Sequence, residues 1–492
     1  MSAAETRPTV RLSIFRNWLT LIGFVGVVGS LFSFLLLVAL DVLSPTSNPY
    51  VGILGYLVAP FFVGFGLLLV VVGLFIEHRR IVKDSAHPPP LLLMDFSQPH
   101  ARRNLVVFAM GTAAFLLFAA IASYRSYHFS ESSGFCGQAC HAVMNPEFTT
   151  YLHSPHARIS CSACHIGPGA AWYVKAKISG LYQVYATLSG KFSRPIATPV
   201  KNLRPAQETC EQCHWPQKFA GNLERIYSHF LTDDANTPYE IRMLLKVGGG
   251  DPTHGPLGGI HWHMNVGQRV EYIATDEQRQ VIPWVRVTDL QGVVTEYRTP
   301  KFDGKVDPAA IRRMDCMDCH NRPSHVFQNP NDTVDLALAL GNLDPKMPGI
   351  KKMAMDLLSQ TYATEKEAMQ KIATALHAKY AEDPRYSKAI DVIQKIYRDN
   401  FFPEMKTDWR VHPNNLGHKD WPGCFRCHDG EHVTADGKKP IKANDCTACH
   451  IILAQGSGKD LERFNPAGNE FAHPGGDIGD AKCVECHPVA GK

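Results

Sequence analysis

The 492-residue sequence is defined first by what it lacks. No cysteine lies outside seven short motifs, so no thiol remains for a separate disulfide framework. No basic stripe is present and the net charge is only +4, which gives no indication of nucleic-acid binding. No long apolar run occurs after Tyr124. These absences predict an apolar front end followed by a larger water-exposed part.

All fourteen cysteines belong to seven motifs in which a histidine directly follows the second cysteine. In chain order, the motifs comprise Cys136, Cys140 and His141; Cys161, Cys164 and His165; Cys210, Cys213 and His214; Cys316, Cys319 and His320; Cys424, Cys427 and His428; Cys446, Cys449 and His450; and Cys483, Cys486 and His487. Two residues separate the cysteines in every motif except the first, where three residues do.

The C-x-x-C-H spacing is the signature of c-type haem attachment. The thiols add to the two vinyl groups of a haem, and the histidine binds one axial face of its iron. Zinc ribbons and disulfide frameworks also pair cysteines, but neither needs a histidine after every pair. The sequence therefore predicts seven covalently bound haem c groups, with a free thiol pair as the alternative for Cys136 and Cys140.

Three apolar runs lie near the N-terminus, at Trp18–Leu40, Val51–Ile76 and Leu105–Tyr124. The first has 23 residues without a charge, which is long enough to span a bilayer. Lys and Arg are absent from the loop Asp41–Tyr50 but flank the first run and fill the second loop. The positive-inside rule then places the N-terminus in the cytoplasm. We expect three transmembrane helices in a bacterial inner membrane, with the haem-binding part in the periplasm, where such haems are attached.

The remainder predicts a mixed fold, mostly α-helical or irregular around the haems, with a small antiparallel β insertion. The expected segments are a membrane domain (1–125), a haem core with three motifs (126–222), a β-rich insertion (223–305), the fourth motif (306–332), a helical insertion (333–405) and the last three motifs (406–492). Apolar spacing predicts three helices in the helical insertion. The C-terminal segment has few apolar residues, so haems must supply much of its core.

Each iron needs a second axial ligand, and histidines close to the motifs are the best candidates. The favoured residues are His156, His261, His263, His325, His418, His432 and His473. Less favoured are His153, His229, His254, His377 and His412. Met144 lies three residues after His141 and could bind the first iron, where methionine raises the reduction potential. The alternative is that Met144 only packs against the haem.

Three stretches resemble a known family: "CHAVMNPEFTTYLHSPHARISCSACHIGPG", "AKISG" and "ETCEQCHWPQKF". Over about residues 100–222 they are similar to the NapC/NirT family of membrane-anchored multihaem quinol dehydrogenases. The resemblance implies oxidation of menaquinol near the first haem, and transfer of electrons along the haems to periplasmic c-type cytochromes in anaerobic respiration or extracellular electron transfer. It also implies a methionine ligand, here Met144, and a quinol pocket with Lys175 and Lys177. Glu147 is the candidate proton acceptor.

Two alternative functions remain open at the sequence level. One is a terminal multihaem reductase with an open haem, although no C-x-x-C-K motif is present. The other is a haem wire inside a larger respiratory complex. Lys175 and Lys177 could equally contact lipid headgroups from an interfacial helix. The expected partners are the membrane quinol pool, the lipid bilayer and periplasmic cytochromes, and a homo-oligomer is left open.

Overall fold

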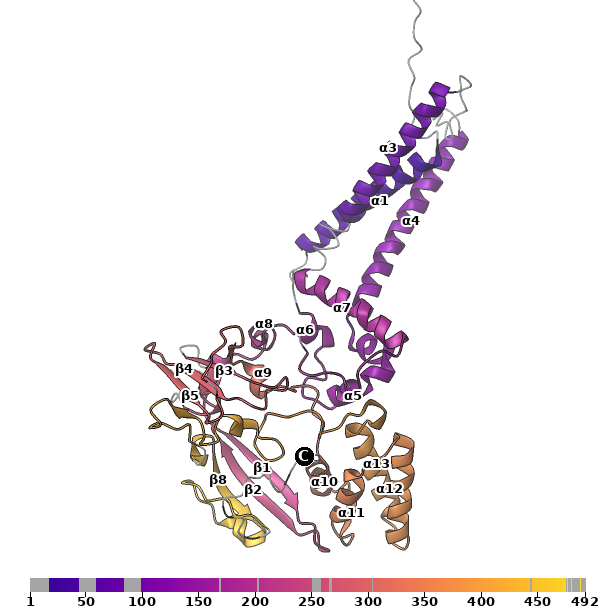
Figure 1. Ribbon diagram of the computed structural model, residues 1–492. Helices are drawn as coiled ribbons and strands as arrows, with labels where there is room; N and C mark the ends of the chain where they lie inside the picture. Colours follow the sequence, from indigo (N-terminus) through magenta and orange to yellow (C-terminus); the bar gives the residue numbers. More distant parts are fainter. Residues whose placement is uncertain are drawn as a thin grey trace, which may run out of the picture. The chain divides into compact units, whose positions relative to one another are not determined.

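The computed structural model describes residues 17–43, 59–83, 99–167, 170–200, 203–249, 258–264, 268–302, 304–442 and 445–474, together with Gly476, Gly479 and His487. The predicted residues Cys483, Cys486 and His254 lie outside this part, as do the side chains of His141 and Lys177. The chain divides into two compact units (Figure 1). The first comprises Met1–Phe135 and Ile166–Gln183, and the second comprises Cys136–His165 and Val184–Lys492.

Long helices dominate the first unit: α1 (Trp18–Leu43), α3 (Ala59–Lys83), α4 (Pro99–Ser130) and most of α7 (Ala170–Leu188). Small residues let α1 and α3 approach closely, since a Cβ atom added at Gly23 would lie 2.6 Å from the carbonyl oxygen of Gly66. The Asn17 side chain donates a hydrogen bond to the Gly73 carbonyl at 2.8 Å. Small residues and a polar clamp of this kind are typical of helices that associate in membranes.

Of the described helices, α1 and α3 are long and apolar enough to cross a bilayer, over Trp18–Leu36 and Ala59–Arg80. They expose large apolar side chains, as expected for contact with lipid. The prediction of three membrane helices is wrong for α4. Its apolar stretch within the described residues is Ala109–Phe118, whereas a span needs about 20 residues. The helix itself continues well past this stretch at both ends.

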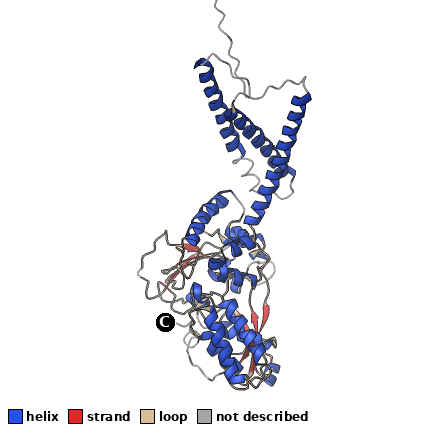
Figure 2. Cartoon of the chain, turned by 90° about the vertical axis from the view of Figure 1, so that its right-hand side faces the viewer, coloured by secondary structure: helices blue, strands red, loops and turns tan. Residues whose placement is uncertain are grey.

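The second unit contains two antiparallel sheets, which appear as two short groups of strands in Figure 2. The three-stranded sheet has the order β1 (Leu223–Phe230), β2 (Pro238–Leu245), β8 (His450–Gly456). The five-stranded sheet has the order β6 (Arg312–Arg313), β3 (Arg269–Ile273), β4 (Trp284–Thr288), β5 (Val294–Arg298), β7 (Val433–Thr434). The predicted antiparallel sheet is therefore confirmed. However, β6, β7 and β8 come from later segments, so the region 223–305 does not form either sheet alone.

Short helices carry or flank the cysteine motifs: α5 (His141–Leu152), α6 (Cys161–His165), α8 (Ala206–Thr209) and α9 (Cys316–Cys319). The helical insertion contains α10 (Pro330–Ala339), α11 (Ile350–Ser359), α12 (Glu365–Tyr380) and α13 (Tyr386–Asn400). Its core is aliphatic, with Ile350, Leu358 and Ile372 fully buried. The three predicted helices correspond to α11–α13. The sequence analysis missed α10, which is short and has the charged Asp335 on its buried side.

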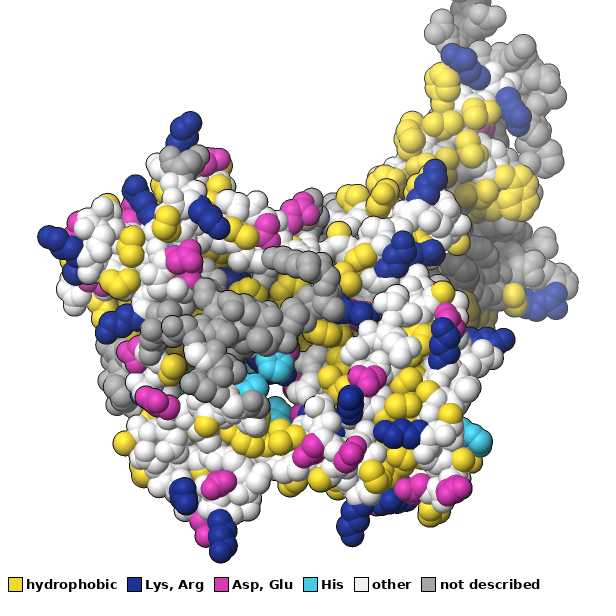
Figure 3. Space-filling view, turned by 60° about the horizontal axis from the view of Figure 1, so that its bottom comes forward, with side chains coloured by type: hydrophobic (Ala, Val, Ile, Leu, Met, Phe, Trp, Pro, Cys, Tyr) yellow, Lys and Arg dark blue, Asp and Glu magenta, His cyan; other side chains and the backbone are white. Residues whose placement is uncertain are grey.

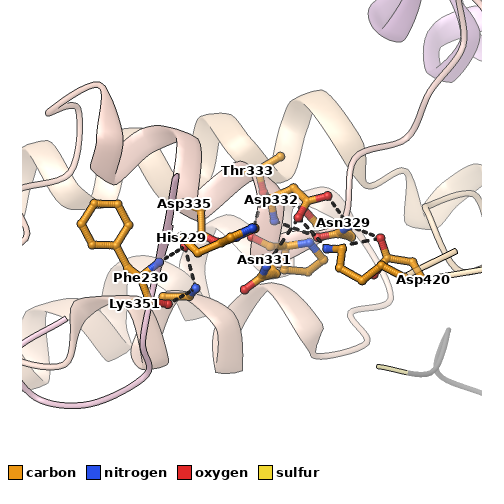
Figure 4. A network of polar contacts seen from close by, with 11 residues as sticks. His229, Phe230, Asn329, Asn331, Asp332, Thr333, Asp335, Lys351 and Asp420 are labelled. Atoms are coloured by element: carbon orange, nitrogen blue, oxygen red, sulfur yellow. Dashed lines mark hydrogen bonds and ion pairs between the residues drawn. The ribbon is translucent and has the colours of Figure 1, made fainter. Parts of the chain in front are cut away.

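A buried polar network attaches the helical insertion to the three-stranded sheet (Figure 4). Asp335 of α10 accepts hydrogen bonds from Nζ of Lys351 at 2.6 Å and from the Phe230 amide at 3.0 Å. It also lies 2.9 Å from Nδ1 of His229. Lys351 and Asp335 are almost completely buried. His229 thus belongs to a structural contact, in agreement with its low rank among the candidate iron ligands.

Candidate haem-binding sites

The described two-residue-spaced motifs each form a single helical turn, either α-helical or 3-10. The amides of His214 and His320 donate to the carbonyls of Cys210 and Cys316, both at 2.8 Å. One turn of helix therefore brings the two sulfur atoms and the histidine of a motif close together. None of the cysteines in the described part forms a disulfide.

The first motif uses a wider turn for its extra residue. Residues Phe135–Ala139 form a π-helical turn, in which each hydrogen bond spans one residue more than in an α-helix. Gly137 packs against the ring of Phe148, where a side chain on residue 137 would collide. Met144 is half-buried, and its amide bonds the Cys140 carbonyl at 3.0 Å. The local structure thus accommodates three residues between the cysteines.

Six motif histidines each face a second histidine from elsewhere in the second unit. The ring centres are 6.3 Å apart for His165–His325, 6.1 Å for His214–His156, 6.3 Å for His320–His261, 5.9 Å for His428–His263, 6.3 Å for His450–His418 and 6.3 Å for His487–His473. Two metal–nitrogen bonds of about 2 Å, plus the distance from each nitrogen to its ring centre, also give roughly 6 Å. Each pair therefore has room for one iron. Figure 3 shows histidine side chains gathered in a hollow of the surface.

In each pair, the histidine that does not belong to the motif is called the outer histidine. A backbone carbonyl orients the outer histidine of several pairs. The Nδ1 contacts are His156 with Pro323 at 3.2 Å, His261 with Val247 at 2.6 Å, His263 with Ile260 at 2.9 Å and His325 with Glu147 at 2.9 Å. A carbonyl oxygen only accepts, so Nδ1 must carry the proton in these contacts. The Nε2 lone pair is then free for a metal, which is the usual arrangement of a ligating histidine.

Burial favours the neutral form of most paired histidines, which is the form that can bind a metal. It lowers the pKa of eight paired histidines below the usual value, namely His165, His263, His320, His325, His418, His428, His450 and His487. The partner ring adds to the effect at His165, where His325 lowers the pKa further. A structural zinc ion needs four protein ligands, and the described residues contain no cluster of three or more potential ligands. Pairs of neutral histidines instead suit haem, whose porphyrin supplies the remaining iron ligands.

A single turn between β2 and β3 supplies two of the outer histidines. The 3-10 turn Ile260–Met264 contains His261, which faces the fourth motif, and His263, which faces the fifth. The turn follows Gly259, whose φ of +113° is in the region that favours glycine. A Cβ atom added at Gly259 would lie 2.5 Å from the Lys246 carbonyl oxygen. The β-rich insertion thus places one histidine beside each of two neighbouring motifs.

His432 was a favoured iron ligand in the sequence, but the structure does not bring it to a motif histidine. Its side chain is fully buried, with Nδ1 2.8 Å from Oδ1 of Asp429 and Nε2 2.7 Å from the carbonyl oxygen of Ile282. Because both ring nitrogens already face acceptors, no lone pair is available for an iron. Proximity to the motif in sequence was therefore a misleading signal, and His432 instead fixes the loop after the fifth motif to the five-stranded sheet.

The predicted proton acceptor Glu147 lies beside an outer histidine. Arg322 donates from Nη2 to both carboxylate oxygens of Glu147, at 3.1 and 3.3 Å, and both side chains are largely buried. The same carboxylate is 3.3 Å from Nδ1 of His325. Burial lowers the pKa of Arg322, while Glu147 opposes this effect. Glu147 thus helps to hold the histidine that faces the second motif, a role that sequence reasoning missed.

The predicted quinol-pocket residue Lys175 lies on α7 in the first unit, whereas Met144 and Glu147 belong to the second. Its Nζ atom is 4.8 Å from the centre of the Trp172 ring. Farther along α7, Ile178, Leu181 and Tyr182 are each more than 60% exposed. An exposed apolar face combined with a lysine–tryptophan pair is typical of a helix at a lipid interface.

Consecutive motifs are close enough for their thiols to interact. The interacting pairs are Cys164–Cys210, Cys210–Cys316, Cys319–Cys424 and Cys424–Cys449. The Cys210–Cys316 pair is hydrogen-bonded, which lowers the pKa of Cys210 to about 6. The second to sixth motifs therefore follow one another in space as they do in sequence.

In the seventh motif, His487 lies within the described part of the chain and interacts electrostatically with Lys419 and Asp420. These two residues directly follow His418, which is the outer histidine of the sixth motif.

Paired histidines beside haem-attachment motifs, on a chain with two apolar N-terminal helices, define a membrane-anchored multihaem c-type cytochrome. Residues 98–214 match the model of the NapC/NirT cytochrome c family, N-terminal region. The chain is 41% identical over 491 residues to the cytochrome c-type protein ImcH of Geobacter sulfurreducens, covering 96% of this chain and 95% of the relative. It is 32% identical over 114 residues to the cytochrome c-type protein NrfH of Wolinella succinogenes, covering 23% of this chain and 63% of that protein. No solved structure matches. The chain belongs to the NapC/NirT family, and ImcH resembles it over nearly its whole length.

Proposed function

We propose that this protein oxidises menaquinol at the outer face of a bacterial inner membrane and passes the electrons to periplasmic c-type cytochromes. The observation that carries the proposal is the set of six facing histidine pairs, each next to a haem-attachment motif. When bound, seven haems would supply one-electron carriers between a two-electron donor and the acceptor.

The chain's own residues hold these carriers in a fixed order. The motif cysteines would hold each haem covalently, and the motif histidine would bind its iron. In the second to seventh sites, we assign the role of second iron ligand to His325, His156, His261, His263, His418 and His473, in that order. For the first site we propose His141 and Met144 as candidate iron ligands.

The quinol side of the reaction is proposed to lie at the membrane surface. The exposed apolar residues of α7 would rest in the lipid interface, where Lys175 and Lys177 can meet a quinol headgroup and take part in proton release. Glu147 is bound to Arg322 and beside His325, so we assign it to the second site rather than to the quinol. Attachment of c-type haem outside the cytoplasm supports a periplasmic haem domain.

The test uses the full-length protein in detergent, loaded with haem. A pyridine haemochrome spectrum should give seven haems per chain, and low-temperature electron paramagnetic resonance should show the second to seventh as low-spin. Mixing with a menaquinol analogue should reduce the haems. Lys175→Ala should slow this reduction by roughly tenfold or more, because a proton-relay group is lost, while dithionite reduction stays unchanged. Lys218→Ala, an exposed lysine of the second unit, is the control.

Two results would contradict the proposal. Failure of every quinol to reduce a fully loaded protein would leave a haem wire within a larger complex. A stoichiometric high-spin haem among the six paired sites would instead indicate an open site and a terminal reductase.

A further inference from the structure

Arg426 is a buried cation inside the fifth motif, between Cys424 and Cys427. Its side chain is only 9% exposed. All of its hydrogen bonds go to backbone carbonyls: Nε to Gly423 at 2.8 Å, Nη1 to Arg279 at 2.9 Å and Nη2 to Asp318 at 2.6 Å. No ion pair in the described part of the chain includes it. Carbonyl dipoles satisfy the N–H groups but leave the positive charge unneutralised.

This guanidinium lies at the junction of the fourth and fifth motifs. Asp318, whose carbonyl it bonds, stands between the two cysteines of the fourth motif. Arg426 itself stands between the two cysteines of the fifth motif. The charge is therefore near sulfur atoms that would become attachment points of two different haems.

The charged side chains near Arg426 form ion pairs with one another and not with its guanidinium. The carboxylate of Asp318 accepts from Arg312 at 2.8 Å, from Arg279 at 3.0 Å and from the Tyr272 hydroxyl at 2.6 Å. Arg312 also pairs with Asp315 at 3.0 Å. Two carboxylates thus balance two arginines. A third carboxylate near Cys427, that of Asp429, contacts His432 at 2.8 Å, so none of the three forms an ion pair with Arg426.

We propose that Arg426 is a fixed cation that raises the reduction potentials of the haems held by the fourth and fifth motifs. A haem that accepts an electron gains one negative charge, and a nearby positive charge in a buried, weakly polarisable environment stabilises that reduced state. The proposal rests on haem binding as proposed above. It does not depend on the identity of the electron donor.

The test compares Arg426→Gln, which removes the charge but keeps hydrogen-bond donors, with Arg426→Lys, which keeps the charge. Full-length, haem-loaded proteins are titrated spectroelectrochemically, and haem content is measured by pyridine haemochrome. In Arg426→Gln, the part of the α-band amplitude that corresponds to two haems should move to more negative potentials. Arg426→Lys should titrate close to the unmodified protein. Arg398→Gln, which removes an exposed arginine from α13, is the matched control and should leave the curve unchanged.

Two outcomes would overturn the role of the charge: an unchanged curve for Arg426→Gln, or equal shifts for the Gln and Lys variants. Arg426→Met provides a second neutral variant if Arg426→Gln loads haem incompletely. Loss of haem from both neutral variants, with full loading of Arg426→Lys, would mean a structural role and would also overturn the proposal. If quinols fail to reduce the unmodified protein but the shift appears on chemical titration, only the quinol dehydrogenase proposal fails.

Discussion

At the scale of single residues, the hydrogen-bond partner of each ring nitrogen separates the proposed iron ligands from structural histidines. His156, His261 and His325 bond a carbonyl through Nδ1, which leaves the Nε2 lone pair for an iron. His432 has acceptors at both nitrogens and so cannot bind a metal. The sequence shows where histidines occur, but some of their ring nitrogens contact residues more than a hundred positions away, such as Pro323 for His156 and Glu147 for His325.

Glu147 offers a test at this scale, because its ion pair and a quinol-site role predict different effects. Glu147→Ala would leave the buried Arg322 guanidinium unpaired, which typically costs about 3 kcal/mol or more. We therefore expect a lower thermal midpoint, measured by circular dichroism in the Soret region. The exposed Glu224→Ala should keep the midpoint of the unmodified protein. A normal thermal midpoint combined with slow quinol oxidation would contradict this structural role and would support Glu147 as a residue of the quinol site.

At the scale of secondary-structure elements, the local sequence pattern predicted where helices and strands lie better than it predicted which strands pair with each other. Alternating β-branched residues indicated β3, β4 and β5, and apolar spacing indicated α11–α13. The sequence did not reveal that β8, which begins at His450 of the sixth motif, pairs with β2. Strand pairing across two hundred residues has no local signal, because it depends on the hydrogen-bonding edge left open by the preceding elements.

Lys351 tests the attachment of the helical insertion to β1. Lys351→Met keeps the approximate volume but removes the cation that pairs with the buried Asp335, at an expected cost of about 3 kcal/mol. Amide exchange in α10 and α11 should then become roughly a hundredfold faster, as measured by hydrogen–deuterium exchange with mass spectrometry. Lys352→Met changes the adjacent but exposed lysine and should leave exchange unaltered. Equal exchange in the two variants would show that the apolar core alone holds these helices in place.

At the scale of the whole molecule, each motif supplies two cysteines and one histidine of a proposed haem site. The segments that connect the motifs supply the second histidine of six sites. The six proposed outer ligands come from the haem core, from the β-rich turn, and from segments around the fourth, fifth and seventh motifs. The motif histidines could be predicted from local spacing. The six pairings could not be assigned to particular motifs, because His325 follows the fourth motif but faces the second, and His418 precedes the fifth but faces the sixth.

The two kinds of segment in the second unit should differ in their need for haem. The helical insertion has an aliphatic core built from side chains such as Ile350, Leu376 and Ile393, with no residue of a cysteine motif in it. The stretch around the fifth and sixth motifs buries few apolar side chains of its own. Protein made without haem attachment should therefore keep slow amide exchange in α10–α13 and lose it between residues 410 and 474.

The measurement is hydrogen–deuterium exchange of the full-length protein produced with and without c-type haem maturation, under the same detergent conditions. In the loaded protein, both segments should be protected, which provides the reference. If both segments lost protection together without haem, the helical insertion would depend on the haem-binding fold for its stability. If both kept it, the polypeptide around the last motifs would fold without its cofactor, and the buried pairs such as His418 and His450 would be preformed before haem arrives.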